Sequence, residues 1–197
     1  MKPPSHTLII RNMVCDRCTA AVRRVLQSNG VAYRNIELGE VELEHAVDAP
    51  VLSVLRADLR KEGFDLVDDR TAQLITRVKS LIVGVVHHSG LSVPKTKLSD
   101  ILSDALHKEY STIASVFTEV EGMTIEQYFL LQRMERVKEL IRYNELSFSE
   151  IADRTGFSSA GHLSAQFKQL TGLTPSAFKN SHSVARLDLD KVGRVSP

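Results

Sequence analysis

Cys15 and Cys18 are the only cysteines in the 197-residue sequence, and they stand in a Cys-x-x-Cys arrangement with Asp16 and Arg17 between them. Two soft thiolates on one short loop suit Cu(I). They are too few for a closed structural zinc site, which takes four ligands. Asp16 could supply a further ligand, so Zn(II) or another soft metal remains an alternative. The sequence therefore predicts a metal site at Cys15 and Cys18 in place of a structural disulfide.

The thiol chemistry depends on the helix that we expect after this pair, over 19–28. A helix N-terminus favours negative charge, so it is expected to lower the pKa of a nearby thiol, and Arg17 adds positive charge. Met13 is expected in the core under the loop and not as a ligand. Soft-metal binding is the interpretation that we favour. A thiol redox switch and an inert remnant are the alternatives.

Hydrophobic periodicity predicts six elements around the cysteine pair. The expected strands and helices are 6–13, 19–28 (helix), 31–38, 41–47, 50–62 (helix) and 64–67. Gly39 and Glu40 form a hairpin signal between the second and third strands. The order is βαββαβ, which is the ferredoxin-like arrangement.

This order, with Cys-x-x-Cys in the first strand-to-helix loop, resembles the heavy-metal-associated domain of copper chaperones and metal-transporting ATPases. The motif runs from Asn12 to Cys18, and Gly63-Phe64 matches the Gly-aromatic pair that precedes the last strand of that family. Asn12 and Val14 depart from the family's Gly and Thr. The resemblance covers roughly residues 6–68 and implies a metal-binding domain, which we place at 5–69.

A second chemistry-bearing stretch lies at 147–179. Ser147 and Glu150 form a capping box, and Gly156 can end the helix that they begin. Ser158 and Ser159 can start another helix, whose apolar stripe is Leu163, Phe167 and Leu170. Two short helices around a tight turn form a helix-turn-helix, whose second helix can enter the DNA major groove.

The same pattern recurs 50 residues upstream, which indicates a duplicated unit. The matched pairs are Ile101 with Ile151, Ile113 with Leu163, Phe117 with Phe167, Gly122 with Gly172, Met123 with Leu173, Thr124 with Thr174 and Tyr128 with Phe178. We expect the first helix-turn-helix over 97–119, and a long connecting helix over 123–143.

The stretch resembles the DNA-binding domain of the AraC/XylS family. The matching residues are Ile151-Ala152, Gly156-Phe157-Ser158, Phe167-Lys168, Thr171-Gly172 and Thr174-Pro175. The resemblance implies two helix-turn-helix units joined by a long helix, here over 94–182, with double-stranded DNA as the partner. The chain as a whole is thus predicted to be α+β, with an N-terminal ferredoxin-like domain, a linking helix and an all-α domain.

Candidate DNA contacts lie on the two expected recognition helices. They are Ser111, Thr112, Ser115, Ser159, His162, Ser164, Gln166 and Lys168. His162 has equal claim to be a solvated helix residue. The charge is unfavourable, since residues 94–183 carry ten Lys and Arg against eleven Asp and Glu. DNA affinity depends on neutralising phosphates, so specific binding is expected to be weak, shape-driven, or dependent on dimerisation or metal.

Residues 70–88 predict one amphipathic helix with a seam only about two heptads long. We expect it to pack against the helix-turn-helix domain, with a homodimer contact as the alternative. His87 and His88 are expected to be interfacial or solvated. The linker is expected at 89–97 (the linking helix and linker together spanning 70–93), and a disordered tail is expected at 183–197.

The function that these predictions favour is a metal-responsive, sequence-specific transcription regulator. The alternative is a metal carrier or adaptor whose helix-turn-helix domain binds protein. The dithiol is the one feature that could be catalytic. The sequence has no Gly-rich phosphate loop and no nucleophile with a base at a recognisable spacing, so we do not expect an enzyme. No signal peptide or long apolar run is found, and we expect a cytoplasmic protein with no membrane contact.

Overall fold

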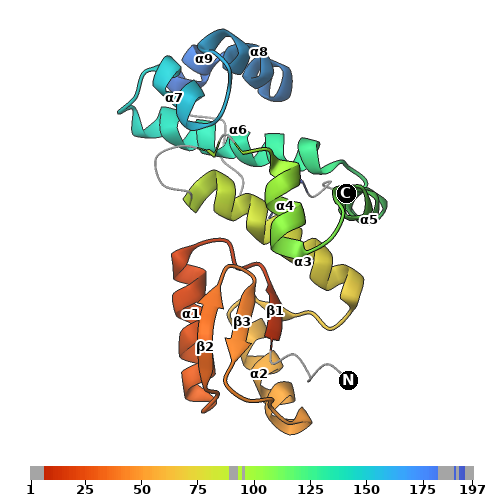
Figure 1. Cartoon of the computed structure of the whole chain (residues 1–197). Coiled ribbons are helices and arrows are strands. Elements are labelled where there is room, and N and C mark those ends of the chain that lie inside the picture. Colours follow the sequence, from red (N-terminus) through yellow and green to blue (C-terminus); the bar gives the residue numbers. More distant parts are fainter. Residues whose placement is uncertain (1–6, 89–92, 95, 182–188, 190, 194–197) are drawn as a thin grey trace. The chain divides into compact units, whose positions relative to one another are not determined.

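The computed structural model (Figure 1) describes residues 7–88, 93, 94, 96–181, 189 and 191–193. The chain divides into two compact units, Met1–Leu81 and Ile82–Pro197. The division falls inside the predicted linking segment 70–93. Each unit has its own core and is described by itself.

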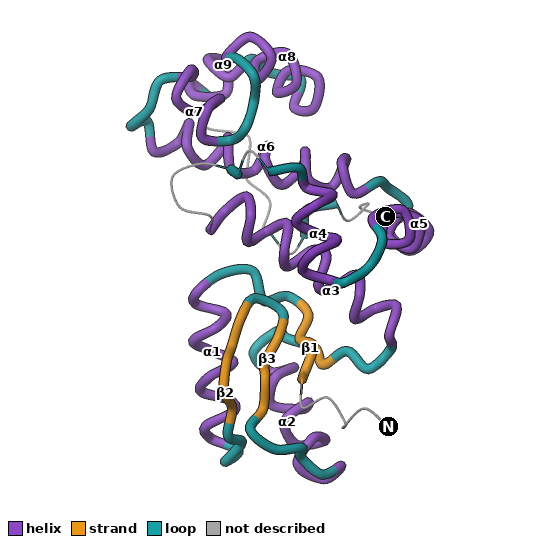
Figure 2. Tube along the Cα trace, viewed as in Figure 1, coloured by secondary structure: helices purple, strands orange, loops and turns teal. Residues whose placement is uncertain are grey.

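The first unit has the order strand, helix, strand, strand, helix, strand. Its elements are β1 (Thr7–Arg11), α1 (Asp16–Ser28), β2 (Tyr33–Glu37), β3 (Glu40–Leu43), α2 (Ala49–Lys61) and β4 (Asp65–Leu66). The antiparallel sheet has the order β2-β3-β1-β4, and Figure 2 shows its strands in orange. The predicted ferredoxin-like fold is confirmed.

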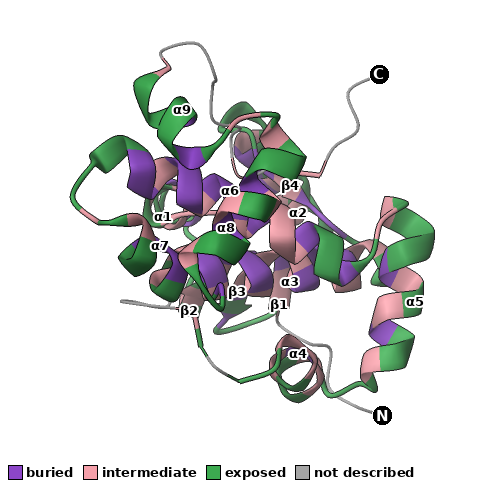
Figure 3. Cartoon of the chain, turned by 90° about the horizontal axis from the view of Figure 1, so that it is seen from above, coloured by how far each residue is buried: buried purple, intermediate pink, exposed green. Residues whose placement is uncertain are grey.

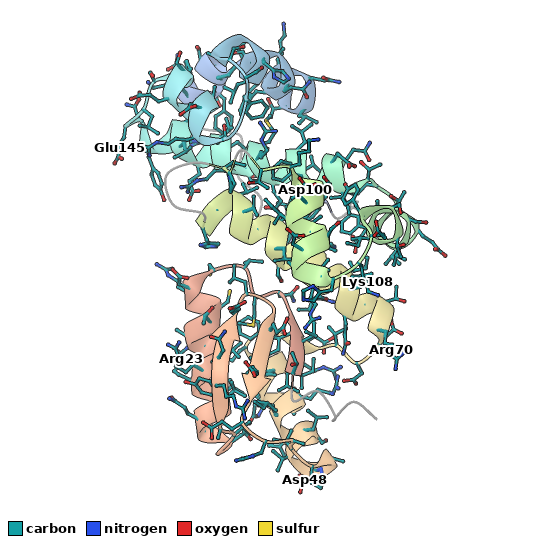
Figure 4. The ribbon with its side chains drawn as sticks, in the orientation of Figure 1. Arg23, Asp48, Arg70, Asp100, Lys108 and Glu145 are labelled. Atoms are coloured by element: carbon teal, nitrogen blue, oxygen red, sulfur yellow. The ribbon has the colours of Figure 1, made fainter. Side chains whose placement is uncertain are left out.

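Both helices of this unit pack on one face of the sheet. Their buried side chains meet strand residues in one core, which includes Val22 and Leu26 of α1, Leu55 and Leu59 of α2, and Ile10 of β1. Asp48, labelled in Figure 4, caps α2 because its carboxylate accepts a hydrogen bond of 3.0 Å from the Val51 amide. The capping and the apolar face together fix where α2 begins and which side it buries.

The second unit is helical. Its elements are the end of α3 (Arg70–Val83), a π-helical turn η1 (Gly84–His88), α4 (Leu98–Leu106), α5 (Tyr110–Glu121), α6 (Ile125–Tyr143), α7 (Phe148–Arg154), α8 (Ala160–Thr171) and α9 (Pro175–Asn180). The predicted all-α domain with two helix-turn-helix units is confirmed, as α4–α5 and α7–α8 with α6 connecting them.

The 50-residue repeat of the sequence is a repeat of structure. Phe117 of α5 packs on Tyr128 with ring centroids 5.7 Å apart, and Phe167 of α8 packs on Phe178 at 5.3 Å. After each recognition helix a glycine takes a positive φ and a threonine then caps the next helix. The same junction is therefore built twice, because each Gly-x-Thr segment can both end one helix and begin another.

The helix predicted over 70–88 is α-helical only to Val83 and continues as a π-helical turn. Gly84 stands at the change, where the lack of a Cβ eases the departure from α geometry. The turn packs against α6, and His87 shares a hydrogen bond of 3.1 Å with the Gln132 side chain. Packing against the helical domain, which the sequence favoured, is thus observed at this end of the segment.

Two predicted segments fall largely outside the described residues. Of the linker 89–97, residues 89–92 and 95 are not described. Of the tail 183–197, only Leu189 and 191–193 are described. There Val192 is buried, and the Leu189 carbonyl accepts a hydrogen bond of 3.2 Å from Gln132. Leu189 and Val192 thus contact the helical unit, and the disorder expected for the tail stays a prediction.

Candidate functional site

The cysteine pair lies at the N-terminus of α1. Cys15 is the N-cap residue in an extended conformation, and Cys18 lies in the first turn, with the two Sγ atoms 3.3 Å apart. Both side chains are half-buried. The helix begins at Asp16 and not at 19 as predicted. The difference arises because Asp16 and Arg17 extend the helix beyond its apolar stripe, and hydrophobic periodicity detects only the apolar positions.

The loop that carries Cys15 is held by Asn12. Asn12 has a φ of 74°, a left-handed conformation that asparagine tolerates better than most residues. Its side-chain amide donates a hydrogen bond of 3.0 Å to the Gly63 carbonyl. The asparagine therefore takes a backbone conformation that glycine adopts most easily, and its side chain ties the Cys loop to the Gly63-Phe64 turn.

Two neighbouring side chains behave differently from each other. Met13 is 1% exposed and belongs to the core, as predicted. Asp16 is exposed, and among the described residues no group of three or more His, Cys, Asp or Glu side chains lies close enough to hold one metal ion. Asp16 is thus not brought together with the two thiols. The arrangement fits a two-sulfur site for a soft cation better than a four-ligand zinc site.

The pKa of Cys18 differs from the lowering that the sequence predicted. Burial raises the pKa of the Cys18 thiol, and the neighbouring Cys15 side chain raises it further. Backbone hydrogen bonds that favour the thiolate are outweighed by desolvation. Since a metal binds the thiolate, loading this pair would release protons, and its affinity would rise with pH.

The second candidate site is the outer surface of the recognition helices. The capping box at Ser147 and Glu150 forms as predicted, and Gly156 takes a φ of 72° in the turn. Ser159 caps α8 by accepting a hydrogen bond of 3.1 Å from the His162 amide. The Ser159 hydroxyl, which was predicted to contact DNA, therefore accepts a hydrogen bond that caps α8.

One face of α8 is fully exposed. It consists of Gly161, His162, Ala165, Lys168 and Gln169. Of the predicted contacts, His162 and Lys168 lie on this face, whereas Ser164 and Gln166 are half-buried on its flanks. Sequence reasoning missed Gln169. The helical spacing from Ala165 could have found it, because residues four apart share a face.

The equivalent face of α5 is exposed in the same pattern, and Figure 3 shows its exposed segments in green. It consists of Ser111, Thr112, Ser115, Thr118 and Glu119. All three residues predicted on this helix lie on the face, and Thr118 was missed. The face carries one carboxylate and no cation, while the α8 face carries Lys168. The two recognition helices are therefore alike in shape and different in charge.

The His162 ring is fixed by local contacts. Its Nδ1 shares a hydrogen bond of 3.0 Å with Ser158, and its ring packs edge-on against Phe157 with centroids 5.6 Å apart. These contacts restrict the ring while leaving the residue exposed at the start of α8. A held, exposed ring has lost part of its rotamer entropy before any ligand binds.

Three basic residues of α6 are engaged by contacts within the helical unit. Lys138 pairs with Glu135 at 2.6 Å and both side chains are buried, and Arg136 pairs with Glu139 at 2.6 Å. Arg133 stacks on the Phe157 ring at 3.7 Å. The Lys138–Glu135 pair lies inside the unit, and the Arg136–Glu139 pair is partly buried.

Comparison with known proteins matches residues 102–181 to a family described as a helix-turn-helix domain. The chain is 26% identical over 140 residues to the probable transcriptional regulator LumQ of Photobacterium leiognathi, covering 69% of this chain and 54% of LumQ. It is 32% identical over 73 residues to the transcriptional activator RhaR of Pectobacterium carotovorum, covering 37% and 26%. The chain thus spans about half or less of the length of these relatives.

Among solved structures, the C-terminal domain of AraT, a response regulator from Geobacillus stearothermophilus, is similar to 61% of this chain and 94% of that one, with a TM-score of 0.48 and 20% identity. The repeated helix-turn-helix geometry and the family match define the helical part as a DNA-binding domain of the AraC/XylS type, at residues 102–181. This is a non-enzymatic class of domain. Within the described ranges, no helix is long and apolar enough to cross a bilayer.

Proposed function

We propose that the protein is a sequence-specific transcription regulator that responds to a soft metal ion, with Cu(I) as the preferred ion. The observation that carries the DNA-binding part is the pair of exposed recognition-helix faces in an AraC/XylS-type domain. The observation that carries the metal part is the pair of half-buried thiols 3.3 Å apart at the start of α1.

On the DNA side, the exposed face of α8 supplies the groups for both kinds of contact. Lys168 can neutralise a phosphate, and the Gln169 amide can pair with an adenine edge. His162 can donate to a base or a phosphate. The hydroxyls of α5 can donate hydrogen bonds to DNA phosphate oxygens but carry no charge. The negative charge of Glu119 would be repelled by the DNA phosphates. In this proposal α8 provides most of the DNA affinity.

On the metal side, Cys15 and Cys18 would hold the ion, which supplies a positive charge and a rigid link between the two sulfurs. Binding of Cu(I) would release two protons and replace two neutral thiols by two thiolates and one cation, so the net charge of the site would change from zero to −1. The Asn12–Gly63 hydrogen bond positions the loop for this change. For the ion to regulate, it must bind one arrangement of the chain more tightly than another. We propose α3, which runs from one unit into the next, as the element that transmits the difference.

The test is fluorescence anisotropy of the reduced protein on DNA from upstream of its own gene. The titration is run at several salt concentrations, with and without one equivalent of Cu(I). A steep salt dependence together with a copper-dependent affinity supports the proposal. The Cys15→Ser, Cys18→Ser variant is the matched control. If this variant keeps the copper dependence, the two cysteines are not the sensor.

A second candidate function has one specific observation in its favour. The exposed face of α5 carries Glu119 and no cation, which suits a protein partner better than DNA. In that case the chain would be a metal-binding adaptor. Failure to enrich any sequence from a random DNA pool, even at low salt, would favour the adaptor over the regulator.

A further inference from the structure

A cavity of about 620 Å³ lies within the helical unit, between the two helix-turn-helix units. Its walls come from η1, from residues 93, 94 and 96 before α4, from α4 and α6, and from α7 and the turn that follows it. A volume of this size falls in the range that holds small organic ligands. None of the functions proposed above uses this cavity.

The walls combine apolar surface with polar groups. Val85, Leu98, Ile101, Phe129 and Phe157 supply aliphatic and aromatic surface. Ligand cavities of proteins commonly combine such walls with a few polar groups that set the orientation of the ligand. The cavity therefore favours a ligand whose body is bulky and apolar.

Arg133 is the polar group that stands out. Its guanidinium stacks on the Phe157 ring at 3.7 Å and lies 5.5 Å from the Phe129 ring centroid. Its Nε donates a hydrogen bond of 2.6 Å to the Thr155 carbonyl. Its Nη2 is buried and has no hydrogen-bond partner among the residues that the structure describes. A Cβ built on Gly156, another residue of the cavity wall, would lie 3.8 Å from that nitrogen.

This arrangement leaves a charged donor unsatisfied. An unpaired buried donor costs free energy, and more so when it is charged. In keeping with that cost, burial lowers the pKa of Arg133 to about 10. Asp153 also lines the cavity but is exposed to solvent, and Nη2 remains without an acceptor. Nη2 has almost no accessible surface, so a carboxylate oxygen that enters the cavity would give it a charge-assisted hydrogen bond after a small shift of the guanidinium.

We propose that this cavity binds a small organic acid, with one carboxylate on a bulky apolar body. The carboxylate accepts from Nη2 of Arg133, and the body packs against Leu98, Ile101 and Val85. The site is built from α4 of the first helix-turn-helix, from α6, and from the turn of the second. A bound acid would therefore stiffen the relation between the two recognition helices. This last consequence depends on the proposed DNA-binding function, whereas binding itself does not.

The experiment uses the full chain and two matched probes, naphthoate and its uncharged counterpart naphthamide. Binding is followed by the fluorescence of the naphthyl group. We expect naphthoate to bind saturably at one site, about tenfold or more tightly than naphthamide, which corresponds to one charge-assisted hydrogen bond. Arg133→Gln should remove this preference. Arg136→Gln, which makes the same change of charge at a residue paired with Glu139 outside the cavity wall, should keep it.

Two further variants keep the proposal testable if Arg133→Gln fails to fold, which circular dichroism would reveal. Thr96→Asp places a carboxylate on the cavity wall and should weaken naphthoate binding while leaving naphthamide unchanged. Ile101→Trp should fill the cavity and weaken both probes. Equal binding of the two probes, or no saturation up to about 1 mM, would overturn the proposal. So would naphthoate binding that is unchanged in Arg133→Gln. If Arg133→Gln does not fold, unchanged naphthoate binding in Thr96→Asp would overturn it instead. Binding of naphthoate by a chain that binds no DNA would leave this site standing and remove the regulator.

Discussion

Two single residues give this protein local properties that one substitution can test. Asn12 occupies a left-handed position that glycine usually fills and adds a hydrogen bond to Gly63 that glycine could not make. His87 is partly buried against α6, where its ring meets Gln132. Asn12 acts through one backbone angle and His87 through one ring, so the effect of each on stability can be tested by one substitution.

Asn12→Ala should destabilise the first unit by about 1–2 kcal/mol, because alanine is strained at positive φ and the hydrogen bond is lost. Asn12→Gly loses the hydrogen bond but keeps the backbone conformation, so it should cost less. The measurement is the urea midpoint of each variant, followed by far-ultraviolet circular dichroism. If alanine is tolerated as well as glycine, the left-handed conformation is not what Asn12 provides.

His87 should make the helical unit sensitive to acid. Burial lowers the pKa of His87 to about 4, below its ordinary value of 6.5. The folded state therefore prefers the neutral ring, so the stabilisation is complete above pH 6.5 and is lost as the pH falls towards 4 and below. The loss should be about 2–3 kcal/mol. We expect the urea midpoint of the native chain to fall over this range.

His87→Gln should flatten that part of the pH profile, since glutamine does not titrate. His88→Gln is the matched control, because His88 is the exposed neighbour on the same turn. An unchanged profile in His87→Gln would assign the acid sensitivity to other groups.

The elements of the helical unit repeat in shape but not in chemistry. α5 and α8 bury equivalent residues and expose equivalent faces, yet only the α8 face carries a cation. The faces follow from helical spacing, since residues three and four apart lie together. The two faces differ in side-chain type, so we expect α5 and α8 to contribute unequally to DNA affinity.

Lys168→Gln should weaken DNA binding about equally across DNA sequences and lower the salt slope by about one. The reason is that one phosphate contact, with its released counterion, is lost. Lys179→Gln on α9 makes the same change of charge on another exposed element and should leave the slope unchanged. Anisotropy titrations at several salt concentrations measure both. Equal effects of the two variants would mean that only net charge matters.

At the scale of the whole molecule, the chain builds two separate cores. One joins β1, β3, α1 and α2, and the other joins α6, α7, α8 and α9. Damage to one core should therefore stay within its unit. This separation also allows the proposed metal binding and the proposed DNA binding to be measured on the same chain as two distinct properties.

Phe167→Ala tests the separation. Phe167 is fully buried and packs on Phe178, so its loss should cost the helical unit about 3–5 kcal/mol. Hydrogen exchange by mass spectrometry should show faster exchange across 98–180 and unchanged exchange across 7–66. Leu170→Ala, at a residue that is 42% exposed, should change neither region. Faster exchange in both regions would show that the two cores stabilise each other.

The sequence by itself determined the order of elements, the cysteine pair and the doubled helix-turn-helix. These rest on local spacing, capping residues and an internal repeat, all of which act between residues close in the chain or at one fixed offset. It also placed Ser111, Thr112, Ser115, His162 and Lys168 on exposed faces correctly, because a helix of known phase fixes its faces.

Only the tertiary structure decided the properties that depend on burial by distant segments. The pKa of Cys18 is raised and not lowered, because packing around the loop desolvates the thiol. Lys138 of α6 is buried with its partner Glu135, because other helices cover this part of α6. The cavity beside Arg133 arises where α4, α6 and the turn after α7 meet. Desolvation and cavities depend on which elements pack together in space. The spacing of residues along one element does not determine that packing.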